Sequence, residues 1–329
     1  MVSTDALVGD GLELGYWLSS EEHAPAALIE HAAAAERAGI RTAMISDHYA
    51  PWTERQGQSA FVWTMLGALA QATSDLRIGT GVTAAVHRMH PLVIAHAAAT
   101  TEVLMPGRFF LGLGTGERLN EDVMGQRWPR PAERRAMLEE AVDLVRALWD
   151  GETVTRTDGH FRVERARLYT RPAVPPPIVV SASGRRSAQL AGRRGDAVLS
   201  AKPDSDVVDA FEAAGGDGKP RLVQLHVCWA EDHEAARRTV RQWWPNGGIP
   251  GAVLGELARP AEFDQLVQAL SDEAIQHAVV TGPDPDRYVD AVTRAVAAGY
   301  TTVYLHQIGP DQRGFLDFVR RELRPRLSG

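Results

Sequence analysis

The sequence has 329 residues, of which 44% are hydrophobic and 23% are charged. This balance is typical of a folded globular protein and argues against a disordered or membrane-embedded chain. A net charge of −7 also argues against nucleic acid as the main partner, because nucleic-acid binding needs a basic face.

The ends of the chain and its cysteine content narrow the possibilities further. The first ten residues lack the basic start and apolar run of a signal peptide, so we expect a cytosolic protein with residues 1–11 as a loose tail. No stretch predicts a membrane span. The single cysteine, Cys228, lies in an apolar run and excludes an internal disulfide and a multi-cysteine metal cluster.

Short β-like runs alternate with helix-length amphipathic segments along the chain. The β-like runs span residues 12–17, 42–46, 76–84, 108–116, 177–183, 196–201, 221–229 and 301–309. Helical patterns between them, such as 24–40 and 131–151, contain a glycine near their end that suits a left-handed cap. Eight repeats of a strand and a helix favour a closed (β/α)8 TIM barrel over an open sheet, with residues 12–329 forming one domain.

Two segments interrupt this rhythm. Residues 151–176 predict a hairpin followed by a proline-rich return, and residues 243–276 hold additional helical material. We interpret both as loop insertions at the mouth of the barrel.

In (β/α)8 barrels the chemistry lies where strands end, at the C-terminal face. Applying this rule to the predicted strands collects the polar residues Glu21, Glu22, Asp47, His48, Trp52, Thr80 to Thr83, Thr115, Glu117 and Asn120. The run from Ser181 to Gly192 leads from a strand into a helix N-terminus, where backbone N–H groups could hold a phosphate.

Other interpretations of these motifs are weaker. Gly114 and Gly116 suggest a dinucleotide fingerprint, but Leu119 stands where its last glycine would be. His87 and His90 have a metal-like spacing without an evident third ligand, so we expect no metal. Asp47 and His48, taken alone, could equally be a helix cap beside a loop histidine.

Several motifs together resemble a known family. "SDHYAPW" from Ser46, "GTGVTA" from Gly79, "RFFLGLGTGERLNE" from Arg108, "SGRRSAQLAGRRGDAVL" from Ser183 and "GPDQRGFLDFV" from Gly309 occur in the order and spacing of the luciferase-like oxidoreductases that use the deazaflavin coenzyme F420. The branch that contains F420-dependent glucose-6-phosphate dehydrogenase is the most similar, and the resemblance covers about residues 12–327.

The resemblance implies that F420 binds across the barrel mouth. The matching cofactor positions are Asp47, Gly81, Val82, Thr115, Gly116, Glu117 and Asn120, with Ser181, Ala182, Ser183 and Gly184 for the phosphate. It also implies a non-prolyl cis peptide between Gly81 and Val82, and a homodimer.

The resemblance further assigns roles in hydride transfer between a small hydroxyl or carbonyl substrate and F420. His48 would receive the hydroxyl proton, Glu117 would handle a proton at the pyrimidine edge of the ring, and Trp52 would line the pocket. Asp47 would orient its neighbours, and Glu21 would hold the substrate.

One region departs from the sugar-phosphate relatives, which grip the phosphate with lysines, a threonine and an arginine. Ala201 stands at the threonine position, His277 at a lysine position, and Lys202 is displaced by about two residues. Lys202 and His277 remain candidates for substrate binding, but a histidine replaces a permanent charge poorly, so glucose 6-phosphate is in doubt.

Two other functions are compatible with the same barrel. One is an FMN-dependent luciferase-like monooxygenase, and the other is an F420-binding protein without turnover. The pairing of Asp47 and His48 with the "GTGE" motif argues against the first, and the presence of His48, Trp52 and Glu117 argues against the second.

Overall fold

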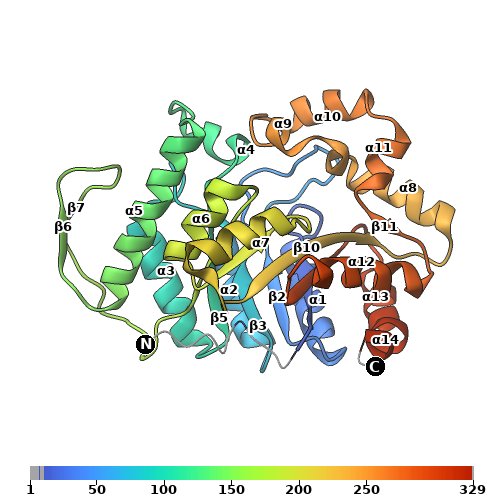
Figure 1. The fold of residues 1–329 in the computed structure, drawn as a ribbon, viewed down its shortest axis with the longest axis horizontal. Coiled ribbons are helices and arrows are strands. Elements are labelled where there is room, and N and C mark those ends of the chain that lie inside the picture. Colours follow the sequence, from blue (N-terminus) through green and yellow to red (C-terminus); the bar gives the residue numbers. More distant parts are fainter. Residues whose placement is uncertain (1–6, 8–10, 328–329) are drawn as a thin grey trace.

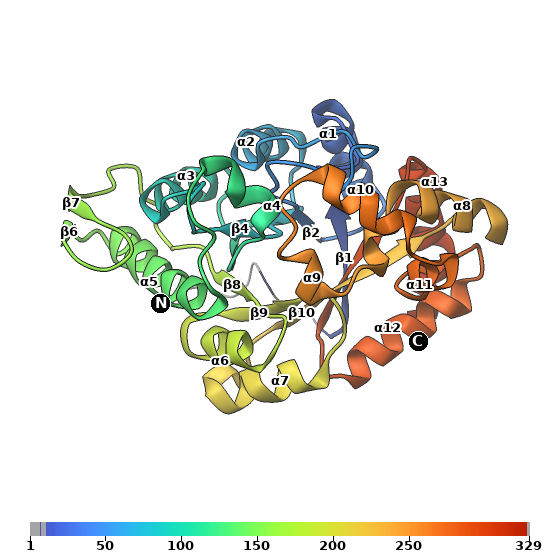
Figure 2. The same cartoon turned by 90° about the horizontal axis from the view of Figure 1, so that it is seen from above.

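A computed structural model describes residue 7 and residues 11–327. In this part of the chain eight parallel strands form a barrel with helices around it (Figures 1 and 2). The barrel strands are β1 (Glu13–Leu18), β2 (Thr42–Ile45), β3 (Arg77–Thr80), β5 (Phe109–Gly114), β8 (Ile178–Ser181), β9 (Ala197–Ser200), β10 (Arg221–Cys228) and β12 (Thr302–Gln307). The predicted (β/α)8 fold and all eight predicted strands are confirmed.

Each barrel strand hydrogen-bonds to its neighbours in chain order, and the pairing of the last strand with the first closes the ring. β10 pairs with β9 on one side and with β12 on the other, while β12 pairs with β1. Two short strands extend this arrangement: β4 (Thr83–Ala84) pairs with β5, and β11 (Val280–Thr281) pairs with β10. All carboxyl ends of the strands therefore lie at one face.

The described residues form fourteen α-helices, most of which shield the outside of the barrel. They are α1 (Pro25–Arg37), α2 (Val62–Ala72), α3 (Pro91–Leu104), α4 (Arg118–Glu121), α5 (Pro131–Trp149), α6 (Arg185–Arg194), α7 (Ser205–Phe211), α8 (His233–Trp243), α9 (Gly251–Leu254), α10 (Pro260–Gln268), α11 (Asp272–His277), α12 (Pro285–Ala297), α13 (Gln312–Phe318) and α14 (Arg324–Leu327). The expected left-handed glycines after α1 and α5 are Gly39 and Gly151, with φ of 83° and 91°. No helix in the described ranges is long and apolar enough to span a bilayer.

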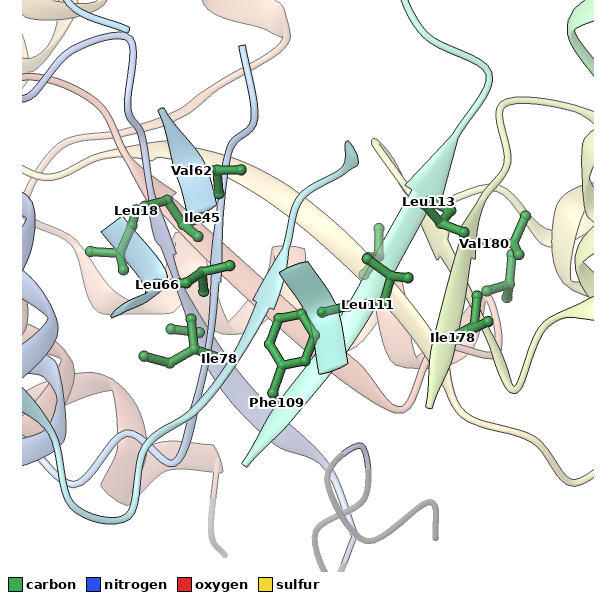
Figure 3. Packing of buried hydrophobic residues seen from close by; sticks show 14 of the residues in the cluster. Leu18, Ile45, Val62, Leu66, Ile78, Phe109, Leu111, Leu113, Ile178 and Val180 are labelled. Atoms are coloured by element: carbon green, nitrogen blue, oxygen red, sulfur yellow. The ribbon is translucent and has the colours of Figure 1, made fainter. Parts of the chain in front are cut away.

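The alternation of side chains along the strands divides the core in two. In β5, Phe109, Leu111 and Leu113 face outward and pack under the helices (Figure 3). Phe110, between them, belongs to the cluster that fills the barrel interior. Inward positions of every strand therefore share one interior, and those near the carboxyl ends open into its mouth.

The N-terminal tail expected at residues 1–11 lies outside the described residues, except for Leu7 and Gly11. Leu7 is buried in the same interior cluster as Trp17 and Tyr304. It therefore contributes apolar area to the barrel core.

The two insertions lie in different places. Residues 151–176 form the predicted hairpin, β6 (Val154–Arg156) with β7 (Val163–Ala166), on the opposite side of the molecule from α8 and α11 (Figures 1 and 2). Its turn donates two backbone N–H groups to Glu140 of α5, which holds the hairpin against this helix. The expectation that both insertions lie at the mouth is therefore wrong for the hairpin.

The second insertion contains α9, α10 and α11 and lies above the barrel mouth (Figure 2). The backbone N–H of Arg118, after β5, donates to the carbonyl of Gly255 at 3.2 Å. Phe263 of α10 packs on Trp52, after β2. This insertion covers the carboxyl ends of at least two strands.

Glycine is required where β3 and β5 lie closest together. A Cβ added to Gly112 would stand 1.9 Å from the carbonyl oxygen of Thr80. The Thr80 hydroxyl is bonded to the same glycine, donating to its carbonyl at 2.8 Å and accepting from its N–H at 3.0 Å. The peptide between Gly81 and Val82 follows directly and is cis, as expected.

We therefore expect Gly112→Ala to lower the free energy of unfolding by about 1 to 3 kcal/mol, because the backbone of β3 would have to shift. Gly67→Ala is the matched control, since a Cβ on this helical glycine of α2 meets nothing within 4 Å and helix propensity favours alanine by about 0.5 to 1 kcal/mol. Urea unfolding measures both. Equal unfolding midpoints for the two variants would contradict the packing argument.

Candidate active site

An imidazole lies between two carboxylates at the barrel mouth. Nδ1 of His48, after β2, is 3.4 Å from Oε1 of Glu21, after β1. Nε2 of the same ring is 3.4 Å from Oε2 of Glu117, after β5. The fold thus brings together three of the predicted site residues from three different strand ends.

Glu21 lies at the buried end of this cluster. Its Oε2 accepts hydrogen bonds from the hydroxyls of Ser46 at 2.6 Å and Ser19 at 2.9 Å. Burial acts to raise the pKa of Glu21, but His48 and the two hydroxyls outweigh it and hold the pKa below its usual range. Glu21 is therefore ionised at neutral pH, and its Oε2 is already bonded to two hydroxyls of the protein.

Glu117 is in a different electrostatic state. Removal from bulk water raises the pKa of its carboxyl, and the negative charge of Glu21 raises it further, against the opposing effect of His48. Its Oε2 accepts one hydrogen bond, from the side-chain amide of Asn120 at 3.2 Å. The Glu117 side chain is 34% exposed, whereas that of Glu21 is 2% exposed, so Glu117 is the member of the pair that faces the open mouth.

Trp52 forms a wall beside the imidazole. Its ring centroid is 4.7 Å from that of His48 and 5.5 Å from that of Phe263 in α10. The indole is buried and packs directly against both His48 and the second insertion.

Asp47 directs its carboxylate away from this cluster. It accepts a hydrogen bond from the Thr83 hydroxyl at 2.7 Å and forms an ion pair with Arg88 at 2.8 Å. Glu121 supports the same loop by accepting the backbone N–H groups of His87 and Arg88. Asp47 thus ties the end of β2 to the segment after the cis peptide, which agrees with an orienting role.

The two histidines with metal-like spacing have structural partners. His90 caps α3 by accepting the N–H of Leu92 at 3.1 Å, and Nε2 of His87 is 3.1 Å from the carbonyl oxygen of Arg127. Within the described ranges no group of three or more His, Cys, Asp or Glu side chains could hold a metal ion.

Three of the predicted cofactor positions, Thr115, Gly116 and Asn120, follow β5 at the same face of the barrel. Gly116 has a φ of 73°, and a Cβ there would lie 3.2 Å from both Ala84 and Val86, so the "GTGE" turn fits closely over the strand end. Thr115 beside it is partly exposed. Asn120 fixes the loop after β2 by accepting the backbone N–H of Tyr49 at 2.8 Å.

The turn from Ser181 to Gly184 leads into the first turn of α6. A Cβ on Gly184 would meet nothing within 4 Å, so the backbone here borders open space. The first N–H groups of any α-helix have no partner within the helix, and Arg185 and Arg186 add positive charge at this end. The Ser187 hydroxyl accepts the N–H of Ser183 at 3.2 Å and thereby shapes the turn. The turn has the features of an anion cradle.

The two candidate substrate cations lie outside the cluster. Lys202 and His277 are exposed, as is Ala201. Among the residues that the structure describes, neither cation has a hydrogen bond or ion pair to Glu21, His48 or Glu117.

A second polar chain escaped the sequence analysis, which collected Glu22 but not its partners. Oε2 of Glu22 lies 2.7 Å from Nε2 of His306, and Nδ1 of His306 lies 3.0 Å from Nδ1 of His226. The signal was present in the sequence, because both histidines occupy inward positions near the carboxyl ends of apolar strands. Their connection depends on strand pairing and is not visible in one sequence.

Comparisons with known proteins find relatives along most of the chain. The family model described as luciferase-like monooxygenase matches residues 12–302. An F420-dependent hydroxymycolic acid dehydrogenase of Mycobacterium tuberculosis is 37% identical over 95% of this chain and 88% of its own length. An F420-dependent glucose-6-phosphate dehydrogenase of Beutenbergia cavernae is 34% identical over 96% of this chain and 97% of its own.

A solved structure is similar over the same range. The F420-dependent secondary alcohol dehydrogenase in complex with an F420-acetone adduct matches with a TM-score of 0.89 and 27% identity, over 96% of this chain and 99% of that one. The match of the family model to most of the chain, together with relatives above 30% identity over nearly its whole length, shows that this protein belongs to the luciferase-like family.

Proposed function

We propose that this protein is an F420-dependent dehydrogenase that transfers a hydride between a CH–OH group and the cofactor. The observation that carries the proposal is His48 held between an ionised Glu21 and a Glu117 of raised proton affinity. Relatives and a structural neighbour named for F420-dependent dehydrogenation of hydroxyl compounds support it. The proposed substrate is a small hydroxyl or carbonyl compound.

The residues at the mouth fit F420. The anion cradle at Ser181, Ala182, Ser183 and Gly184 suits a phosphate, and the surface formed by Gly81, Val82, Thr115 and Gly116 suits a flat ring. When bound, F420 supplies a carbon that accepts or gives a hydride in a two-electron step. Nδ1 of His48 is buried and has no hydrogen bond of normal length. The imidazole could therefore form a new hydrogen bond when a ligand binds.

The protein's own part in the reaction is proton transfer. Alcohol oxidation needs an acceptor for the hydroxyl proton, and we assign this role to His48. Glu21 would stabilise the resulting positive charge from behind, so we assign it to positioning His48 rather than to holding the substrate. Glu117, with its raised pKa, is suited to exchanging a proton with a cofactor at the open side. Trp52 would bound the substrate space.

The alternative functions make different demands on the same residues. An FMN-dependent monooxygenase has no need of a hydroxyl-proton acceptor, and a binding protein without turnover needs none of the proton-transfer groups. The buried support of Glu21 by two hydroxyls favours the dehydrogenase. A homodimer and a cytosolic location are part of the proposal on the family resemblance alone.

We expect F420 to bind at least tenfold more tightly than FMN, a preference of at least about 1.4 kcal/mol. The reason is that the mouth has to accommodate the acidic tail of F420 as well as its ring. Fluorescence titration of the purified protein with each cofactor measures the difference. Comparable affinities would favour the monooxygenase.

We expect poor turnover of glucose 6-phosphate relative to the sugar-phosphate dehydrogenases. Ala201 and His277 remove two parts of their phosphate grip, and a hydrogen bond to a charged group contributes about 1.5 to 3 kcal/mol. Each lost contact would lower kcat/KM roughly tenfold to a hundredfold. A screen of alcohols and sugars with oxidised F420, following ring absorbance, tests this. Efficiency equal to that of the sugar-phosphate enzymes would show that other cations grip the phosphate.

We expect His48→Ala to lower turnover by about 100-fold to 10,000-fold with F420 affinity changed only a few fold, because a positioned base is lost. Glu117→Gln keeps the side-chain shape and should also slow hydride transfer. His96→Ala, on the exposed face of α3, is the matched control. Single-turnover reduction of bound F420 with the best substrate of the screen separates chemistry from binding. A wild-type rate for His48→Ala would assign the proton to another acceptor.

A further inference from the structure

Glu22, His306 and His226 form a hydrogen-bonded chain along the carboxyl ends of three neighbouring strands, β1, β12 and β10. The Glu22 and His306 side chains are both 0% exposed, and the backbone N–H of Gly309 donates to the other Glu22 oxygen at 2.9 Å. His226 is partly exposed. Within the described residues its Nε2 has no hydrogen-bond partner. The Glu22 end of this hydrogen-bonded series is thus closed to solvent, and the His226 end is open.

Strand alternation places the open end in the mouth. Leu222 of β10 and Tyr304 of β12 belong to the interior cluster, so His226 and His306 point inward near the carboxyl ends of the same strands. Register confirms the pairing, since these two histidines are direct partners in the ladder between β10 and β12. Trp244 packs against both rings, at 5.2 Å from His226 and 4.4 Å from His306.

The nitrogen-to-nitrogen contact restricts where protons can lie. Two Nδ1 atoms 3.0 Å apart share one proton, because one must donate and the other accept. When Glu22 is ionised, it accepts from Nε2–H of His306, which accepts in turn from Nδ1–H of His226 and leaves Nε2 of His226 as an acceptor. When Glu22 is protonated, each bond reverses and Nε2 of His226 becomes a donor.

We propose that Glu22, His306 and His226 form a proton relay that carries one proton between the barrel mouth and a buried carboxyl without charging either imidazole. A proton that enters at Nε2 of His226 displaces the Nδ1 proton to His306. His306 passes its Nε2 proton to Glu22, so the numbers of protons gained and lost at each ring are equal. Both rings change tautomer, in opposite senses.

The electrostatics of the interior favour this arrangement. Burial lowers the pKa of His226 to about 3 and that of His306 to about 4, so both rings are neutral at neutral pH. Burial raises the pKa of Glu22 to about 7, which suits a group that gains and loses a proton near neutrality. The titratable groups that act on these three residues are Glu21, His23, Tyr16 and Cys228, with the ring of His31 edge-to-face against that of His23.

The relay would give the mouth a proton store separate from His48. Its use in turnover rests on the proposed dehydrogenase function, in which each alcohol oxidised releases a hydroxyl proton. The relay itself depends only on the three side chains.

Imidazole ¹⁵N NMR of the full-length protein without cofactor tests the relay. We expect the protonated nitrogen of His226 to change from Nδ1 to Nε2, and that of His306 from Nε2 to Nδ1, in one transition as the pH falls through about 7. Neither ring should show the signature of a charged imidazole at pH 6 to 8. Invariant tautomers, or an imidazolium at either position at neutral pH, would overturn the proposal.

Two variants link the transition to its carboxyl. Glu22→Gln should abolish the coupled change of tautomer. Glu102→Gln is the matched control, because Glu102 is another buried carboxyl whose pKa burial raises to about 7, and it bonds the N–H of Gly107 instead of a histidine. Loss of the transition in both variants, or its survival in Glu22→Gln, would also overturn the relay. The wild-type titration decides the matter even if Glu22→Gln fails to fold. A failed relay would leave the His48 experiments unaffected, since these measure hydride transfer.

Discussion

The pairing of β10 with both β9 and β12 is the interaction on which the site depends. Together with the pairing of β12 with β1 it closes the sheet, and closure directs every second side chain of eight strands into one narrow interior. Residues 284 positions apart then meet where β12 pairs with β1, as Glu22 and His306 do. Without these pairings the sheet would be open, with β9 and β12 as its edge strands. The polar groups of β10 and β1 would then not face a common interior.

The same closed interior explains why similar carboxylates behave differently. In a medium of low polarity, the state of each carboxylate depends on its own hydrogen-bond donors. Both carboxylates lie 3.4 Å from the His48 ring, but Glu21 accepts from two hydroxyls, whereas Glu117 accepts from one amide and lies near the charge of Glu21. Proton affinity therefore differs between the two carboxyls beside His48. Glu21, on the buried side, is ionised, whereas Glu117, on the open side, binds a proton more readily.

Much of this could be predicted from the sequence. Eight β-like runs separated by amphipathic helical segments predicted the order of the strands, and the rule that chemistry gathers at strand ends selected Glu21, His48 and Glu117 from the sequence alone. The cis peptide and the assignment of individual roles came from family resemblance. The ion pair of Asp47 with Arg88 was not predictable, because Arg88 lies in a loop whose path follows the cis peptide.

The partners of Glu22 were missed for a related reason. Sequence patterns show that His226 and His306 face inward, but only the register between β10 and β12 shows that they face each other. The position of the hairpin on α5 likewise depends on contacts between distant segments, among them the hydrogen bonds of Glu140 to the turn, which have no local signature.

Phe263 of the insertion packs on Trp52, and Trp52 packs on His48. One aromatic ring therefore separates the insertion from the proposed base. The insertion lies between α8 and β11, outside the eight barrel strands, so its length and composition can change without altering the register of the barrel. Duplicated copies of such a gene can therefore diverge through this one segment. Selection on α10 alone would reshape the space above the imidazole, while the hydrogen-bonded groups on the strands are inherited unchanged.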